Sequence, residues 1–258
     1  MEAKSFQKKI WEHYKKNARH FPWRSTRNGY RILVSEIMLQ QTQTDRVIPK
    51  YTSFIKKFPD FKSLAKAENF EVLKEWQGLG YNRRGLNLKR AAEMVASHFG
   101  GTLPRSLHDL ESLPGIGPYT AGALTAFVYD KPAVFIETNI RTVYLHFFFP
   151  NKKKVPDDKL LDLIAETLPS KNFREWYYAL MDYGVFLKKS GIRINSKSAH
   201  YNKQSTFKGS HREKRSMILK LLLKDPKLSL RKLETASGLP KETISAILDA
   251  YKKEGFIK

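Results

Sequence analysis

The 258-residue chain carries 47 Lys and Arg against 25 Asp and Glu, which gives a formal net charge of +22 at pH 7. This charge favours a polyanionic partner, although a basic ribosomal protein or a membrane-surface protein would share it. Because the chain contains no cysteine, disulfides, thiolate zinc sites and iron–sulfur clusters are excluded. No apolar run approaches the ~20 residues of a membrane span, so we expect a soluble, cytoplasmic protein without membrane contact.

Two helices joined by an extended stretch are predicted first. Hydrophobic periodicity predicts an amphipathic helix over residues 6–17 and a mostly buried helix over residues 30–42. Between them, Pro22 disfavours helix at the preceding residue. Arg24 follows this extended stretch and is a candidate contact for a cleft or a DNA phosphate.

Glu36 lies in the apolar part of the second helix, in the segment SEIMLQQTQT at residues 35–44. A carboxyl group in apolar surroundings loses solvation when it ionises, so its pKa should rise. A raised pKa suits a general acid that must hold a proton near neutrality. A glutamate on a solvated helix face, or one paired with an arginine, would occur in the same pattern.

A glycine-rich loop, GLGYNRRG at residues 78–85, follows the short helices predicted over residues 61–76. Its glycines allow the backbone to approach a partner closely, and Tyr81 offers a flat ring beside Arg83 and Arg84. An exposed aromatic ring beside arginines suits stacking in DNA together with phosphate binding. A tyrosine packed on its own lobe is the alternative.

Two glycines connect the next pair of predicted helices, over residues 106–112 and 119–129, in the segment LPGIGPYTAG at residues 113–122. Gly115 and Gly117 allow a tight turn and leave backbone N–H groups at a helix N-terminus, which favours an anion. In a basic chain the expected anion is a DNA phosphate. A plain turn between packed helices would also contain this pattern.

A second carboxylate candidate is Glu137, in the segment VFIETNIR at residues 134–141. It lies at or near a predicted helix N-terminus, which should keep it ionised. Glu36 would then be pushed toward its neutral form while Glu137 stays charged, and such pairs are typical of an acid and a charge stabiliser. A capping carboxylate without a chemical role would occur in the same pattern.

Together, these segments resemble the helix-hairpin-helix DNA glycosylases of base-excision repair, and SEIMLQQTQT resembles the signature of MutY-type adenine-DNA glycosylases. The resemblance implies that Glu36 is the catalytic acid. It also implies that Glu137, with Tyr119 nearby, stabilises the sugar cation, and that Asn139 supports this carboxylate. The DNA contacts predicted from the motifs and the resemblance are Gln40, Gln41, Tyr81, Arg83, Arg84, Gly115, Gly117, Thr120 and Arg24.

The sequence departs from this family at the catalytic motifs. Family enzymes typically have Asp where Glu137 stands. Bifunctional relatives have a Schiff-base lysine where Tyr119 stands, so we expect no amine-based lyase step. Tyrosine occurs there both in some adenine glycosylases and in the thymine-mismatch enzymes.

The iron–sulfur loop of the family has lost its ligands in this sequence. Its cysteine positions fall on Lys188, Asn195, Ser198 and Gln204. Further basic residues, including Lys203, lie in this loop. We expect either a DNA-phosphate contact without metal or a solvated loop, and neither a metal nor a cofactor in the protein.

Three short helices are predicted in the C-terminal segment, over residues 212–224, from residue 228, and over residues 241–253. With the turn at residues 238–240 they suggest a helix-turn-helix or winged-helix-like module. Acidic residues in the third helix argue against insertion of this helix into a DNA groove. Packing of the module on the glycosylase lobes, or contact with another protein, therefore fits the sequence as well as DNA binding does. The segment is too short for the domain with which longer relatives read 8-oxoguanine.

We therefore predict an all-α, two-lobed helix-hairpin-helix glycosylase fold in three parts. Residues 1–24 and 131–204 form a terminal-helix lobe, with the metal-free loop at 188–204. Residues 25–130 form a helical barrel lobe that contains the hairpin, and residues 205–258 form the C-terminal module.

The predicted function is a monofunctional DNA glycosylase that hydrolyses the N-glycosidic bond of adenine mispaired with guanine or 8-oxoguanine. Its expected partner is double-stranded DNA with a mismatched or damaged base, bound by a monomer that is nucleoid-associated through the DNA. The alternatives are a thymine or uracil mismatch glycosylase and a non-catalytic DNA-binding protein on the same scaffold.

Overall fold

The computed structural model describes residues 2–199 and 206–257, and helices are its regular elements within these ranges. An isolated bridge between Val155 and Ser198 is the one β-type pairing among the described residues. The chain divides into two compact units. Unit 1 comprises Met1–Glu36, Leu103–Ser112 and Ile116–Lys203, and unit 2 comprises Ile37–Thr102, Leu113–Gly115 and Gln204–Lys258. The predicted all-α class is confirmed, whereas the predicted three-part division stays a prediction.

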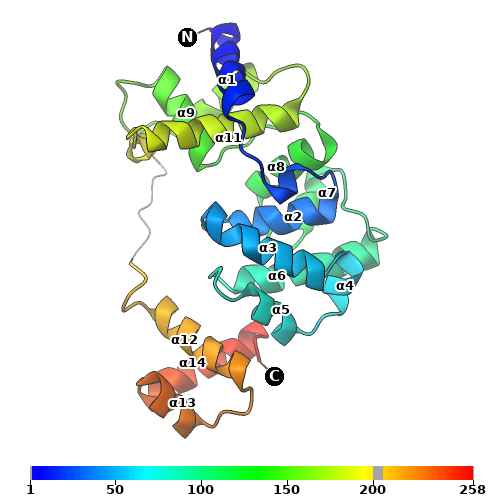
Figure 1. Cartoon of the computed structure of the whole chain (residues 1–258), viewed down its shortest axis with the longest axis vertical. Coiled ribbons are helices and arrows are strands. Elements are labelled where there is room, and N and C mark those ends of the chain that lie inside the picture. The colour runs from blue at the N-terminus through cyan, green and yellow to red at the C-terminus, as the bar shows by residue number, and fades with distance from the viewer. Residues whose placement is uncertain (1, 200–205, 258) are drawn as a thin grey trace. The chain divides into compact units, whose positions relative to one another are not determined.

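Each unit contains helices from separate stretches of the chain, as the colours in Figure 1 show. Those of unit 1 are α1 (Ala3–Asn17), η1 (Pro22–Arg24), α7 (Leu107–Ser112), α8 (Pro118–Tyr129), α9 (Thr138–Phe148), α10 (Asp157–Glu166), α11 (Phe173–Lys189) and η2 (Asn195–Lys197). Those of unit 2 are α3 (Thr44–Lys57), α4 (Phe61–Lys66), α5 (Asn69–Trp76), α6 (Arg83–His98), α12 (His211–Lys224), α13 (Leu230–Ser237) and α14 (Lys241–Glu254). The remaining helix, α2 (Gly29–Leu39), begins in unit 1 and ends in unit 2.

Helix α11 is the centre of unit 1, where it lies along α9 and also packs against α1 (Figure 1). The Phe6 ring of α1 lies 5.2 Å from the Tyr144 ring and 5.9 Å from the Trp176 ring, centroid to centroid. Gly184 permits the close approach of α9 and α11, because a Cβ at this position would lie 2.7 Å from the Asn139 Cβ. This packing fixes the N-terminal end of α9 against α11.

In unit 2, the C-terminal helices α12, α13 and α14 share an apolar core with α5 and α6. Leu73 and Leu86 belong to the same buried cluster as Ile218, Ile244 and Tyr251. Figure 1 shows α12 and α14 beside α5, and α12 contacts α5 directly. The predicted three-helix module is therefore present, and it packs on the barrel helices.

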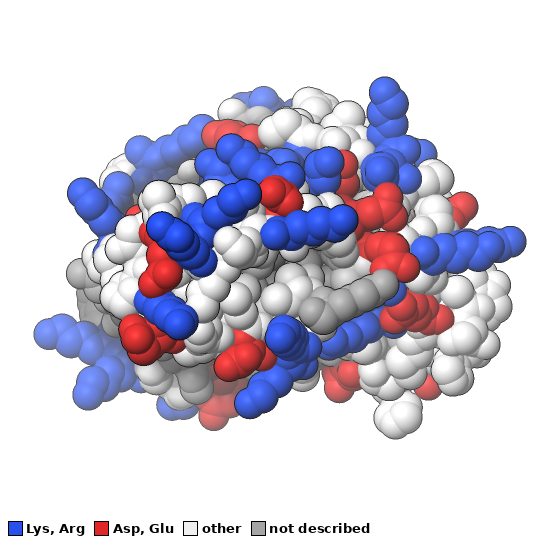
Figure 2. Space-filling model, turned by 90° about the horizontal axis from the view of Figure 1, so that it is seen from below, with Lys and Arg blue, Asp and Glu red and all other residues white. Residues whose placement is uncertain are grey.

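Charge is distributed over the surface. On the face seen in Figure 2, Lys and Arg side chains project around most of the outline, and Asp and Glu lie among them in smaller groups. Among the helices that the structure describes, none is both long and apolar enough to cross a membrane.

Candidate active site

Glu36 and Tyr119 form the first candidate pair, within unit 1. Glu36 on α2 is 5% exposed, and its Oε2 accepts a hydrogen bond from the Tyr119 hydroxyl at 3.1 Å. Burial raises the pKa of Glu36 to about 7, and the Glu137 carboxylate acts in the same direction, against the hydrogen bond from Tyr119. The raised pKa predicted from the apolar sequence around Glu36 is confirmed. At neutral pH this carboxyl can hold a proton.

Tyr119 stays protonated in this environment. It is the second residue of α8, after the proline that begins the helix. Burial raises the pKa of its hydroxyl well above the usual value, and the Glu36 and Glu137 carboxylates act in the same direction. Its ring meets Phe135 edge-on, 5.8 Å away between centroids. Tyr119 is therefore a fixed hydrogen-bond donor to Glu36.

Glu137 is the N-cap of α9. Its Oε1 accepts hydrogen bonds from the backbone N–H of Asn139 at 2.7 Å and of Ile140 at 2.9 Å. Its Oε2 accepts a third from the Asn139 side-chain amide at 3.1 Å. The predicted capping position is confirmed, and three donors hold the carboxylate in one orientation.

The pKa of Glu137 is raised above the usual value of a glutamate. Burial raises it, whereas the hydrogen bonds of Asn139 and Ile140 and the charge of Lys188 favour the ionised form. The sequence predicts a carboxylate held in its charged form by the helix end. Burial in the folded protein opposes the cap, whereas the hydrogen-bond donors and Lys188 favour the ionised carboxylate.

Lys188, predicted only as part of a basic loop, instead contacts the residues around Glu137. It lies near the end of α11, and its Nζ donates a hydrogen bond to the Asn139 Oδ1 at 2.7 Å. Because an ammonium group only donates, this contact turns the amide NH₂ of Asn139 toward Glu137. Burial lowers the pKa of Lys188, and Glu137 opposes that effect. Lys188, Asn139 and Glu137 therefore form one hydrogen-bonded series.

Arg24, which the sequence predicts to contact a cleft or a DNA phosphate, is paired with Asp182. Its two terminal nitrogens donate to the two carboxylate oxygens of Asp182, each at 2.9 Å. The guanidinium lies 4.3 Å from the centroid of the Tyr178 ring, and its side chain is 9% exposed. These contacts occupy the group that the sequence assigns to DNA. Arg24 instead joins η1 to α11 and stabilises the ionised form of Glu36.

Within unit 2, Arg84 holds the end of α2. It donates to the backbone carbonyls of Ile37 at 2.8 Å and of Leu79 at 3.1 Å, and to the Thr42 hydroxyl at 3.0 Å. A third carbonyl, that of Gln40, accepts a short hydrogen bond from the same side chain. Arg84 is therefore a C-terminal capping residue as well as a predicted DNA contact.

Gln40 and Gln41 directly follow the helix end that Arg84 holds. α2 ends at Leu39, three residues before the predicted end. Gln40 is half-buried, and Gln41 is exposed with φ at +53°, in the left-handed region. The left-handed residue turns the chain sharply out of the helix, which leaves Gln41 exposed as a DNA contact requires.

Tyr81 is exposed on its loop, also with a positive φ of +47°. Its hydroxyl accepts a hydrogen bond from Arg212 of α12 at 2.6 Å. The guanidinium groups of Arg212 and Arg84 lie 5.5 and 5.7 Å from its ring centroid. Arg83 is paired with Glu254 at 3.1 Å. Arg84 therefore lies beside the Tyr81 ring as predicted, whereas the second arginine at the ring is Arg212 of the C-terminal module and not Arg83.

The hairpin has the predicted backbone. Gly115 has φ at +82°, and a Cβ there would lie 3.0 Å from the Asn87 Cβ, so glycine is required. Gly117 is exposed and is the N-cap of α8. Thr120, by contrast, is 2% exposed. Because this side chain is buried, it is not exposed for the DNA contact that the sequence predicts.

The described part of the loop that resembles the cluster-binding loop, residues 188–199, makes polar contacts with the rest of unit 1. Besides Lys188, the Asn195 Oδ1 accepts a hydrogen bond from the Thr142 hydroxyl at 2.9 Å. Ser198 donates to Asp157 at 3.4 Å. Two further residues of the prediction, Lys203 and Gln204, lie outside the described residues. The prediction that the protein needs no metal and no cofactor stays a prediction.

Two parts of the chain match known protein families. Residues 34–168 match the family described as HhH-GPD superfamily base excision DNA repair protein. Residues 212–258 match the family described as winged helix-turn-helix DNA-binding. The two-lobed glycosylase class and the C-terminal module predicted from the sequence are thereby confirmed.

Similar proteins carry two kinds of name. An adenine DNA glycosylase of Buchnera aphidicola is 35% identical over 67% of this chain and 50% of its own length. A thymine/uracil-DNA glycosylase of Methanothermobacter thermautotrophicus is 32% identical over 71% of this chain and 85% of its own length. A solved thermostable thymine-DNA glycosylase has a TM-score of 0.63 and 29% identity, and the match covers 70% of this chain and 85% of that one. The chain spans only 50% to 62% of three adenine DNA glycosylases that it matches.

Proposed function

Because this chain belongs to the HhH-GPD superfamily of base excision DNA repair proteins, we propose that it is a monofunctional DNA glycosylase. The proposed substrate is adenine opposite guanine or 8-oxoguanine in double-stranded DNA. The observation that carries the proposal is the pair of carboxyl groups in unit 1. Glu36 has a pKa of about 7, and Glu137 is held by three hydrogen-bond donors.

The protonated Glu36 carboxyl is the general acid. It donates its proton to N7 of the adenine, as in the MutY-type mechanism, and the electron pair of the glycosidic C–N bond leaves with the base. Its pKa of about 7 leaves a useful protonated fraction near neutrality. Tyr119 donates to the same carboxyl and orients it. Proton donation to the leaving group contributes about 10²- to 10⁴-fold in rate.

The ionised Glu137 stabilises the positive charge that develops on the sugar as the bond breaks. Because its donors and Lys188 hold it in place before reaction, no reorganisation is needed in the transition state. Water then adds at the sugar carbon and gives up a proton, which restores the Glu36 carboxyl. The products are free adenine and an abasic site.

The monofunctional part of the proposal depends on the amines near the site. Tyr119 occupies the position of the Schiff-base lysine of bifunctional relatives, and a phenol cannot form a Schiff base. The Lys188 amine donates a hydrogen bond to the Asn139 Oδ1. Borohydride added during turnover should trap no protein–DNA adduct. A trapped adduct that disappears in Lys188→Met would make Lys188 a nucleophile and overturn this part.

Thymine or uracil opposite guanine is the second candidate substrate. The Methanothermobacter relative is named a thymine/uracil-DNA glycosylase, and this chain covers 85% of it. Adenine as the substrate is supported by the SEIMLQQTQT segment and by the adenine DNA glycosylase relatives. Base release from matched duplexes separates the two candidates.

Glu36→Gln tests the catalytic proposal. The assay is single-turnover base release with excess enzyme, on a duplex that contains adenine opposite guanine, with alkali added afterwards to cleave abasic sites. We expect base release to fall by about 10²- to 10⁴-fold, while the affinity for the duplex persists. Full base release by the variant would rule out Glu36 as the acid.

A further inference from the structure

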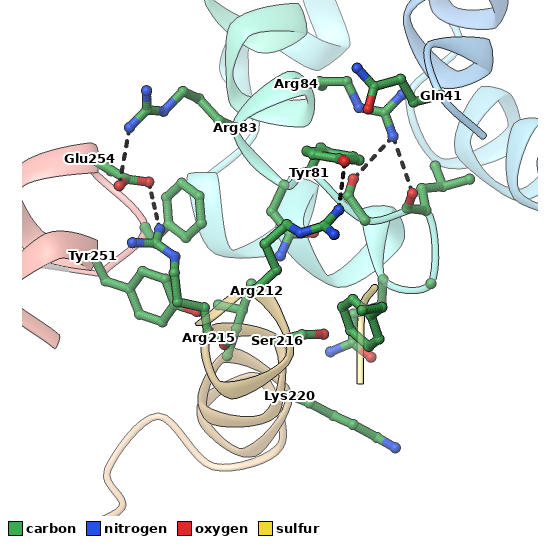
Figure 3. Close-up of a pocket in the computed structure, with 18 of the residues that line it drawn as sticks. Gln41, Tyr81, Arg83, Arg84, Arg212, Arg215, Ser216, Lys220, Tyr251 and Glu254 are labelled. Atoms are coloured by element: carbon green, nitrogen blue, oxygen red, sulfur yellow. Dashed lines mark hydrogen bonds and ion pairs between the residues drawn. The ribbon is translucent and has the colours of Figure 1, made fainter. Parts of the chain in front are cut away.

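Unit 2 contains a cavity of about 1080 Å³ that the catalytic proposal does not use. It lies between the Tyr81 loop and α12, and both elements belong to this unit (Figure 3). Gln41 also lines it. The cavity therefore joins two residues of the proposed DNA contact to the C-terminal module.

The lining of this cavity is strongly cationic. One carboxylate, Glu254, faces a set of seven Lys and Arg side chains: Arg46, Lys50, Arg83, Arg84, Arg212, Arg215 and Lys220. Glu254 is paired with Arg83 at 3.1 Å and with Arg215 at 2.8 Å. Figure 3 shows both arginines directed at this one carboxylate. Glu254 is the one carboxylate among the lining residues, so the lining carries an excess of positive charge.

Both lysines of the lining are available for a ligand. Lys50 of α3 and Lys220 of α12 form no hydrogen bond or ion pair with the residues that the structure describes. Figure 3 shows Lys220 extending clear of the arginines of its own helix. Like charges held together without anions are costly, and a polyanion removes that cost.

The C-terminal module is fixed where these charges need it. Ile218, Ile244 and Tyr251 share a buried cluster with Leu73 and Leu86 of the barrel helices. In addition, the Asn69 side-chain amide donates to the Gly255 carbonyl at 2.8 Å. The cations of α12 are therefore preorganised beside the Tyr81 loop.

We propose that this cavity binds the phosphodiester backbone of double-stranded DNA, and that α12 carries the DNA contact of the C-terminal module. Helix α14, the second helix of the helix-turn-helix pair, is committed elsewhere. Ile244 and Tyr251 on α14 are buried against the barrel, Glu254 holds two arginines, and Glu242 and Asp249 are on its exposed side. The inference rests on the proposed function, in which Tyr81 and Gln41 contact DNA.

The test is the salt dependence of binding to a lesion-free duplex, measured with the double variant Lys50→Ala/Lys220→Ala. Each phosphate contact contributes about 0.9 to the slope of log affinity against log salt concentration. We expect the slope to fall by about 1.8. If the variant and the wild type bind equally at 1 M salt, this difference in slope lowers the affinity of the variant roughly 60-fold at 0.1 M salt. Lys50→Arg/Lys220→Arg should keep the wild-type slope.

The matched control is Lys56→Ala/Lys66→Ala, which removes two exposed lysines of the same unit that do not line the cavity. It should leave the slope near the wild-type value. An unchanged slope in the cavity variant, or an equal fall in the control, would overturn the proposal. Binding to lesion-free DNA needs no excision, so this result is independent of whether adenine is released.

Discussion

Lys188→Met should impair catalysis because it removes the amine that orients Asn139 and supports the charge of Glu137. The variant keeps the apolar stem of the side chain and loses the 2.7 Å hydrogen bond from Nζ to the Asn139 Oδ1. A hydrogen bond from a charged donor contributes about 1.5–3 kcal/mol. If that loss falls on the transition state, the rate of base release drops by about 10- to 150-fold.

The pH profile of this variant separates a catalytic effect from a merely structural one. The charge of Lys188 lowers the pKa of Glu137, against burial, which raises it. Removing that charge raises the pKa of Glu137 further, so a higher pH is needed to ionise it. The acid limb of the single-turnover profile should therefore move to higher pH in Lys188→Met.

Lys189→Met is the matched control, because Lys189 is the exposed neighbour on the same helix. It should keep both the wild-type rate and the wild-type acid limb. Base release by Lys188→Met at the wild-type rate, or an acid limb at the wild-type position, would contradict this role of Lys188.

Four further outcomes are expected. The wild-type rate should fall as pH rises through about 7, because Glu36 loses the proton it must donate; single-turnover rates between pH 5 and 9 check this, and a flat profile would contradict it. Glu36→Gln should gain stability over the wild type on going from pH 5 to pH 8, because only the wild type must then ionise a buried carboxyl; thermal melts at the two pH values measure it, and an equal difference at both argues against burial as the cause. Glu137→Asp should keep the cap, although the carboxylate reaches one methylene less far. A large rise in the single-turnover rate of this variant would mean that the natural Glu is a degraded site. Gly184→Ala should cost about 1–3 kcal/mol of unfolding free energy, because its Cβ would meet Asn139; denaturant titration measures this, and an unchanged midpoint would show that α11 can shift.

The sequence predicts features that depend on neighbours along the chain. Glu36 is surrounded by apolar residues in its own helix, which foretells its burial and its raised pKa. Glu137 stands directly before α9, which foretells the cap. The positive φ of Gly115 follows from the Gly-x-Gly turn.

The contacts that escape the sequence join residues far apart in the chain. Lys188 and Asn139 are 49 residues apart, and Arg24 and Asp182 are 158 apart. No periodicity indicates that a guanidinium assigned to DNA will instead meet a buried carboxylate. The raised pKa of Glu137 has a similar origin. The cap is local and visible in the sequence, whereas the burial that opposes it is produced by the packed fold.

The most direct test of the central claim is wild-type base release under single-turnover conditions from three duplexes. They contain adenine opposite 8-oxoguanine, adenine opposite guanine, and thymine opposite guanine. We expect release of adenine, followed by strand cleavage only after alkali. Release of thymine alone would contradict the adenine assignment. Binding without release from all three would contradict catalysis and leave a DNA-binding protein on a glycosylase scaffold.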